Sequence, residues 1–190
     1  GAAWIWPCLL RSYVGTGDNV DWMKCPSAPP EAQWNVTYGS GLPASDGYLA
    51  DELRLRPGGA SFMSYGYNVW GGWAGKNPNT GLGVYKGDPI YGGAKASSVR
   101  VPTDMIAIGD SNWDLDQKGD RDWSGFIGMY AERQWPLEVH AKRANILFAD
   151  GHVAGLPRTE MIAQLVKDPS EKRRVARRWN RDHEPHVTAN

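Results

Sequence analysis

Runs of apolar residues predict several strands in the central part of the chain. Residues 102–110 (PTDMIAIGD) run apolar between turn-forming residues, as a buried strand does. Residues 124–131 (SGFIGMYA) form a second, shorter candidate. In residues 61–75 (SFMSYGYNVWGGWAG), aromatic and small residues alternate, which predicts a strand followed by a glycine-rich loop. These segments are expected to pair in one sheet.

A hairpin is predicted next. Residues 145–149 (NILFA) and 152–156 (HVAGL) are two strand-like runs separated by Asp150-Gly151. Asp-Gly favours a two-residue type I′ turn, because both central positions need positive φ. The expected pairs are Ala149 with His152, Phe148 with Val153, and Leu147 with Ala154. Ile146, Phe148 and Val153 would then share the core face, and His152 would lie on the other face.

Helical patterns are found at both ends of the chain. Residues 7–15 (PCLLRSYVG) predict a short amphipathic helix that begins at a proline and stops at a glycine. Residues 158–167 (RTEMIAQLVK) predict another helix, with Thr159 as its cap. Residues 170–180 (SEKRRVARRWN) predict the last one, capped by Ser170.

These patterns divide one domain of 190 residues. Residues 1–15 hold the first helix, 16–100 a loop-rich insertion, 101–157 the sheet core, and 158–190 the C-terminal helices and tail. The 23 glycines and 13 prolines agree with long loops between few regular elements. The expected fold class is α+β.

Charge and motifs exclude several classes of function. Lysine plus arginine and aspartate plus glutamate are 21 each, so the chain has no overall field that would attract nucleic acid or a membrane surface. The basic run 171–181 is expected to be a solvated helix face that touches an acidic neighbour. Nucleophile-elbow, phosphate-loop and zinc-binding motifs are absent, and both cysteines lie far in sequence from the four histidines.

An acidic stretch, residues 110–123 (DSNWDLDQKGDRDW), is a candidate calcium loop. Alternating carboxylates around a glycine supply the oxygen ligands that calcium requires. The candidate ligands are Asp114, Asp116, Asp120 and Asp122. Lys118 and Gly125 stand where an EF-hand would carry acids, and a solvated acidic turn is the alternative interpretation.

Tryptophan and cysteine raise two further hypotheses. Ten tryptophans are present, and Trp70, Trp73 and Trp113 lie in loop-like surroundings where indoles can stack on sugar rings. Burial of these rings under the loops is the alternative. Cys8 and Cys25 have 16 residues between them and form either a disulfide or two buried thiols.

Two histidines and an aspartate flank the hairpin: His140, Asp150 and His152. A histidine and a carboxylate can perform acid–base catalysis, but no accompanying nucleophile or metal motif is identifiable. A structural role is therefore favoured over a catalytic one. We expect His140 to form a hydrogen bond near the sheet edge, to Asp110 or to Asp150.

Four motifs in order resemble one bacterial family. His140 is followed by nine residues and then Asp150-Gly151, and the chain also contains CPSAPP (25–30), SYGYN (64–68) and VPTDMIAIGDS (101–111). This combination resembles the prepilin-like proteins with the prepilin-type processing-associated His-x9-Asp-Gly domain, which are numerous in planctomycetes. The likeness extends from about residue 4 to residue 156.

The resemblance implies a relative of type IV pilins and of the pseudopilins of type II secretion. Such proteins have a cleaved leader, a long hydrophobic N-terminal helix and an α+β head with an antiparallel sheet. Neither leader nor helix is present in these 190 residues, and the abrupt apolar start predicts a head cut from a longer precursor. Membrane contact is expected only through that missing helix. Pseudopilin heads commonly hold calcium near the sheet, which strengthens the case for the acidic loop.

The function expected from this resemblance is non-enzymatic. The protein would lie outside the cytoplasm and act by filament assembly, secretion or surface binding. Its partners would be other pilin-like subunits or the secretion machinery, and nucleic acid is not expected. Two alternatives stay open: a carbohydrate-binding module that uses the loop tryptophans, and a hydrolase that uses His140 and Asp150.

Overall fold

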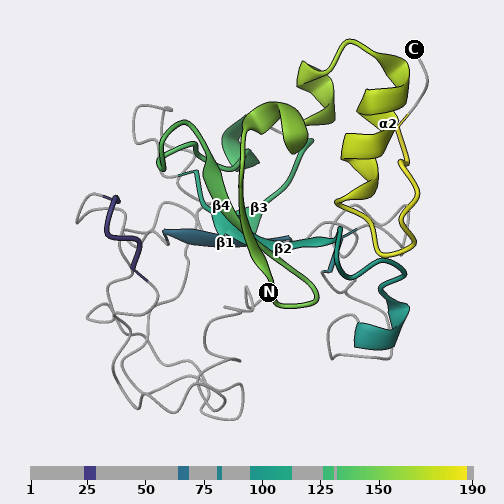
Figure 1. The fold of residues 1–190 in the computed structure, drawn as a ribbon, viewed down its shortest axis with the longest axis horizontal. Helices are drawn as coiled ribbons and strands as arrows, with labels where there is room; N and C mark the ends of the chain where they lie inside the picture. The colour runs from purple at the N-terminus through teal and green to yellow at the C-terminus, as the bar shows by residue number, and fades with distance from the viewer. Residues whose placement is uncertain are drawn as a thin grey trace, which may run out of the picture.

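The computed structural model describes residues 24–28, 64–68, 81–82, 95–112, 126–130 and 132–187. Its centre is a five-stranded sheet with strand order β3-β1-β2-β4-β5 (Figure 1). The strands are β1 (Tyr65–Asn68), β2 (Ile106–Asp110), β3 (Phe126–Ile127), β4 (Ala144–Phe148) and β5 (Val153–Leu156). The helical elements are α2 (Pro169–Arg177) and the 3-10 turns η4 (Ala96–Ser98), η6 (Glu132–Gln134), η7 (Arg158–Glu160) and η8 (Ala163–Leu165). The fold class is α+β, and each of the predicted strand segments contributes a strand.

The sheet is mixed, whereas an antiparallel sheet was expected. The pairs β1–β2, β2–β4 and β4–β5 are antiparallel, but β1 and β3 are parallel, with Tyr67 opposite Phe126. A tight turn forces two neighbouring strands to be antiparallel, and the long connection from β1 to β3, which includes β2, imposes no such constraint. β1 also shows that the segment 16–100 supplies an internal strand of the sheet as well as loops.

The β4–β5 hairpin forms, but the predicted register and turn are wrong. The Phe148 N–H donates to the His152 carbonyl at 2.9 Å, so residues 149–151 form a three-residue loop. Gly151 alone takes a positive φ, 98°, as in a type I turn followed by a glycine bulge. Ile146 and Phe148 face the core as predicted, but the shift of one residue inverts the predicted faces of β5. Val153 is 63% exposed, and the His152 ring stacks on Phe148 with centroids 4.3 Å apart.

The helix predicted over 158–167 is replaced by η7 and η8. Met161, Ile162 and Ala163 are all fully buried, and three consecutive residues cannot face the core from one side of an α-helix. Thr159 caps no helix, since the residue before η7 is Pro157. For the next helix, α2, the N-cap was predicted at Ser170, and this is also wrong, because Asp168 is the N-cap.

The last helix, α2, begins after Asp168. The Asp168 Oδ1 accepts hydrogen bonds from the backbone N–H groups of Ser170 and Glu171, both at 2.9 Å, and Pro169 occupies the first helical position. These contacts satisfy donors that the first turn of a helix leaves free.

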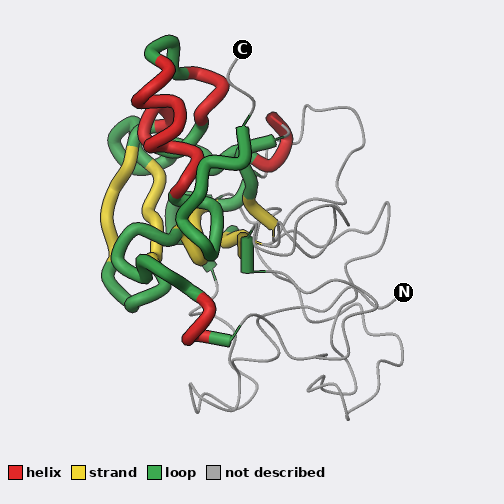
Figure 2. The backbone as a smooth tube through the Cα atoms, turned by 90° about the vertical axis from the view of Figure 1, so that its right-hand side faces the viewer, coloured by secondary structure: helices red, strands yellow, loops and turns green. Residues whose placement is uncertain are grey.

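The core lies between the sheet and this C-terminal part, whose helical segments lie together near the C-terminus at the top of Figure 2. Strand residues and C-terminal residues share one cluster of buried apolar side chains, which includes Ile106, Ile127, Ile146, Phe148, Met161, Ile162, Val175 and Trp179. The Trp179 Nε1–H also donates to the Met161 carbonyl at 2.6 Å. Within the described residues, no helix has the length and apolar character needed to cross a membrane.

The basic run 171–181 touches acidic neighbours, as predicted. The Arg174 guanidinium donates to both carboxylate oxygens of Glu160, and the Arg178 guanidinium lies 3.0 Å from Asp104. These ion pairs tie the end of the chain to η7 and to the segment before β2.

Candidate functional site

Cys25, Asp110 and His140 come from three distant segments and meet at one end of the sheet. The Cys25 Sγ lies 3.4 Å from the His140 Nε2, although 115 residues separate them. The same nitrogen lies 3.5 Å from the Asp110 Oδ1. Among the described residues these three form a group whose potential ligand atoms all lie within 4.8 Å of one another. We call them the Cys–Asp–His cluster.

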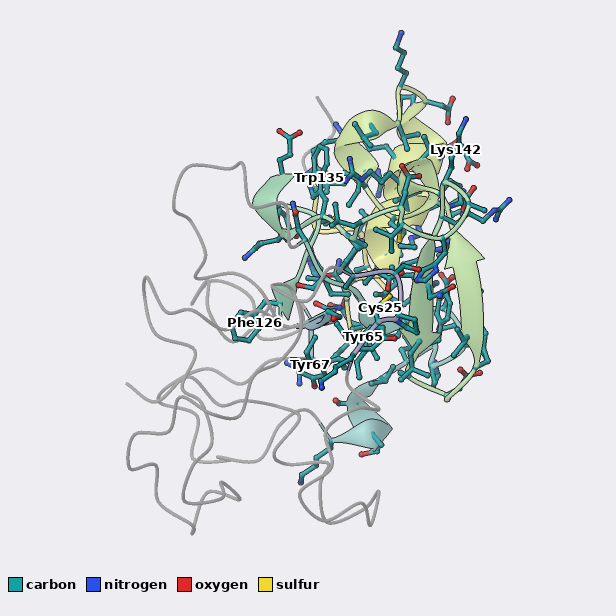
Figure 3. All side chains as sticks on the ribbon, turned by 90° about the vertical axis from the view of Figure 1, so that its left-hand side faces the viewer. Cys25, Tyr65, Tyr67, Phe126, Trp135 and Lys142 are labelled. Atoms are coloured by element: carbon teal, nitrogen blue, oxygen red, sulfur yellow. The ribbon has the colours of Figure 1, made fainter. Side chains whose placement is uncertain are left out.

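A proline turn positions Cys25. The Ala28 N–H donates to the Cys25 carbonyl at 3.0 Å, and Pro26 follows the cysteine directly, the position that proline favours in a β-turn. The thiol is fully buried and packs with Ala28 and Tyr65. Figure 3 shows Cys25 and Tyr65 next to each other. The CPSAPP motif therefore brings a thiol to the sheet.

A two-residue turn positions His140. The His140 and Arg143 backbones exchange two hydrogen bonds of 3.0 Å, and Ala141 and Lys142 between them take φ values of 51° and 61°. Two positive φ values are the mark of a type I′ turn, which non-glycine residues adopt at a cost of about 1 kcal/mol each. The chain accepts this strain at the turn that directs His140.

Asp110 is the last residue of β2 and is fully buried. Its Oδ2 accepts the Asn145 backbone N–H at 2.6 Å, whereas its Oδ1 has no hydrogen-bond partner among the described residues. Burial raises the pKa of this carboxyl, and the Asn145 hydrogen bond and nearby His140 oppose that rise. Oδ1 faces the His140 Nε2 at 3.5 Å.

Tyr65 borders the cluster from β1. Burial first, then the neighbouring Cys25 and Asp110 and a hydrogen bond with the cysteine side chain, together raise the pKa of its phenol to about 12. Tyr65 is therefore neutral near pH 7 and can act as a hydrogen-bond partner of the thiol.

The arrangement differs from a cysteine–histidine–aspartate triad. In such a triad the nucleophile contacts one ring nitrogen and the carboxylate contacts the other. Here Cys25 and Asp110 both face Nε2 of His140. The ring cannot accept a proton on Nε2 from Cys25 while Asp110 holds it through the opposite nitrogen. Three donor atoms around one point suit the binding of a cation better than a proton relay.

The structure separates the predicted trio. His140 lies 3.5 Å from Asp110, one of its two expected partners, but the hydrogen bond that its Nε2 forms is with Cys25. Asp150 instead pairs with His152 at the other end of β4, where its Oδ1 lies 2.6 Å from the ring Nδ1 and 3.1 Å from the backbone nitrogen. No single site contains His140, Asp150 and His152.

The other candidates fall outside the described residues. They are the acidic-loop residues Asp114, Asp116, Asp120 and Asp122, the tryptophans Trp70, Trp73 and Trp113, and Cys8. Calcium binding and glycan binding there stay predictions. Cys25 is a free thiol in the structure, which for this residue corresponds to the buried-thiol alternative rather than the disulfide.

Sequence reasoning missed that Cys25 joins His140 and Asp110. Distance in sequence had argued against any grouping of cysteine with histidine. The one signal was that Cys25 begins the CPSAPP motif, Asp110 lies in the VPTDMIAIGDS motif and His140 begins the His-x9-Asp-Gly motif.

Comparisons with protein-family models, with curated proteins and with solved structures found no match to this chain.

Proposed function

We propose that this chain is the non-enzymatic head of a pilin-like protein that lies outside the cytoplasm and acts by assembly, secretion or surface binding. One observation carries the proposal. The four motifs that resemble the prepilin-like family converge on the same place: Cys25 from CPSAPP, Tyr65 from SYGYN, Asp110 from VPTDMIAIGDS and His140 from the His-x9-Asp-Gly motif.

Convergence supports a shared structural purpose for these motifs. Cys25 and Asp110 are buried, and the Ser111 N–H next to Asp110 donates to the Ser64 carbonyl next to Tyr65 at 2.8 Å. The motif residues thus join the loop 24–28, β1, β2 and the turn before β4. A family that keeps such contacts would keep the head folded while its exposed loops vary.

The geometry gives less support to a hydrolase. His140 and Asp150 lie beyond opposite ends of β4, whose five residues span about 15 Å. The nucleophile nearest to His140 is the Cys25 thiol, which is fully buried and shares Nε2 with Asp110. A substrate would have no access to that sulfur without movement of the loop 24–28.

The test is to express the natural gene, with an epitope tag after Asn190, in its own host. We expect an upstream leader and hydrophobic helix, and we expect the tag in the surface or sheared-filament fraction. Deletion of the upstream helix should leave the tag inside the cell or in the soluble periplasm. A gene without such a helix, or a product that stays cytoplasmic, would overturn the proposal.

A further inference from the structure

We infer that the Cys–Asp–His cluster binds a divalent transition-metal ion of the zinc class, through the Cys25 Sγ, the Asp110 Oδ1 and the His140 Nε2. The three atoms lie within 4.8 Å of one another and come from three segments of the fold. This inference does not depend on the proposed function, because the ion would hold the head together whatever the head binds.

The distance between the His140 Nε2 and the Asp110 Oδ1 fits a shared ion better than a direct hydrogen bond. A charge-assisted hydrogen bond between imidazole and carboxylate has a length of about 2.7–2.9 Å, but Nε2 and Oδ1 are 3.5 Å apart. In tetrahedral zinc sites, bonds of about 2.0–2.3 Å separate ligand atoms by about 3.3–3.6 Å. The separation of 3.5 Å from Nε2 to Oδ1 lies in that range. The 3.4 Å from Nε2 to Sγ lies there too, although it is also a normal hydrogen-bond length for sulfur, and Sγ and Oδ1 lie within 4.8 Å of each other.

The unpaired Asp110 oxygen is an independent indication. Asp110 is fully buried, and its Oδ1 has no hydrogen-bond partner among the described residues. The recorded contact of Oδ1 with the His140 Nε2, at 3.5 Å, is longer than a hydrogen bond, so part of the cost of desolvating this carboxylate remains unless a cation compensates for it. A metal ion bound on the His140 side would supply that compensation.

Residues around the cluster contact its proposed metal ligands and hold them in place. The Asn145 N–H fixes the Asp110 carboxylate through Oδ2 at 2.6 Å and leaves Oδ1 for the ion. Tyr65 packs against Cys25 and covers that side of the cluster. The side chain of His140 is 27% exposed, so it is the member of the cluster that lies nearest to solvent.

The donor set selects the class of metal. A thiolate with an imidazole and one carboxylate suits zinc and its substitute cobalt, whereas calcium and magnesium take oxygen ligands. The site is therefore distinct in chemistry from the calcium loop predicted at residues 110–123. A cobalt ion held by a cysteine also has a sulfur-to-metal charge-transfer band, which carboxylate or histidine sites on the surface lack.

The experiment adds cobalt chloride alone to the full chain, after chelator treatment and in the presence of a phosphine reductant. We expect about one ion per chain, with a charge-transfer band that zinc displaces. Saturating zinc should raise the melting temperature by about 5 °C or more. A wild-type protein without the charge-transfer band would overturn the inference.

Matched variants identify the ligands. Cys25→Ser should abolish the charge-transfer band, and Asp110→Asn should weaken binding by about 100-fold or more, while Cys8→Ser and His152→Asn should leave both unchanged. A band that survives Cys25→Ser, or one lost only with Cys8→Ser, would overturn the assignment. If circular dichroism shows that Cys25→Ser is unfolded, Cys8→Ser carries the test, since a band in that variant can come only from Cys25.

Discussion

Strand β4 runs between two tight turns, and each turn carries a histidine near an aspartate. At the first, residues 140–143 form a two-residue turn, and His140 faces the buried Asp110. At the second, residues 149–151 form the hairpin loop, and Asp150 pairs with His152 at the surface. The residue types are the same, but the surroundings are opposite.

The difference shows that burial, rather than residue type, decides what such a pair contributes. Burial raises the pKa of the Asp110 carboxyl, whereas hydrogen bonds from the His152 backbone and ring lower the pKa of the Asp150 carboxyl. At the buried end of β4, the histidine–aspartate pair joins distant segments of the chain, whereas at the exposed end it closes one local hairpin. Changes at the first end should therefore have larger effects.

The largest effect is expected from Asp110→Ala in chelator-treated protein. The change relieves the desolvation cost of the buried carboxylate, but it leaves the Asn145 N–H and His140 without their partner and opens a small cavity. These losses exceed the relief, so we expect a net loss of about 2–4 kcal/mol in the free energy of unfolding. Asp150→Ala removes an exposed pair and should cause a far smaller loss. Urea unfolding of both variants measures this, and equal losses would contradict the comparison.

A glycine at the buried end is expected to give the next largest effect. Gly66 pairs with Gly109, the neighbour of Asp110, and a Cβ at position 66 would lie 2.7 Å from the Ile127 Cγ2 and 2.8 Å from the Phe126 backbone carbon. Gly66→Ala should therefore cost about 1–3 kcal/mol.

Gly155 in β5 is the control for this change. A Cβ there would meet only the flexible Arg143 side chain, at 3.4 Å, so Gly155→Ala should change the stability by less than about 0.5 kcal/mol. Thermal unfolding of the two alanine variants would show the contrast, and a Gly66→Ala protein as stable as the wild type would refute it.

Sequence patterns predicted much of the sheet because strand residues have a local signature. The apolar run in 102–110 and the two runs around Asp150-Gly151 became β2, β4 and β5. The register of the hairpin was wrong because Asp-Gly suits more than one turn. With Gly151 alone at positive φ, the loop has three residues and every partner shifts by one.

The candidate site was only half predictable. The partnership of His140 with Asp110 was anticipated from the sheet edge, but the approach of Cys25 depends on a contact across 115 residues. The type I′ turn at Ala141 and Lys142 also has no local signal, because such turns normally contain asparagine or glycine. There the surrounding fold imposes a conformation that the local sequence does not favour.

Removal of a glycine from one turn and introduction of a glycine at the other should change the stability of the protein in opposite directions. Gly151→Ala places a side chain at φ 98° and should cost about 1 kcal/mol, although the space around it is open. Lys142→Gly relieves a φ of 61° and should stabilise the protein by up to about 1 kcal/mol, less the entropy that a glycine adds to the unfolded chain. Urea unfolding tests both, and a shift of the same sign in both would contradict the assigned turns.

The smallest effect concerns the exposed pair and acid pH. The hydrogen bonds from His152 hold the pKa of Asp150 below its usual range in the folded protein. The stability that this pair contributes is therefore complete above the unfolded pKa of about 4 and is lost as the pH falls through the lower folded value.

A carboxyl-carbon NMR titration should find a midpoint for Asp150 below that of an ordinary aspartate. In His152→Ala the ring donor is lost but the backbone donor stays, so the midpoint should rise only part of the way back. A midpoint in the wild-type protein at or above the ordinary value would show that the pair does not form in solution.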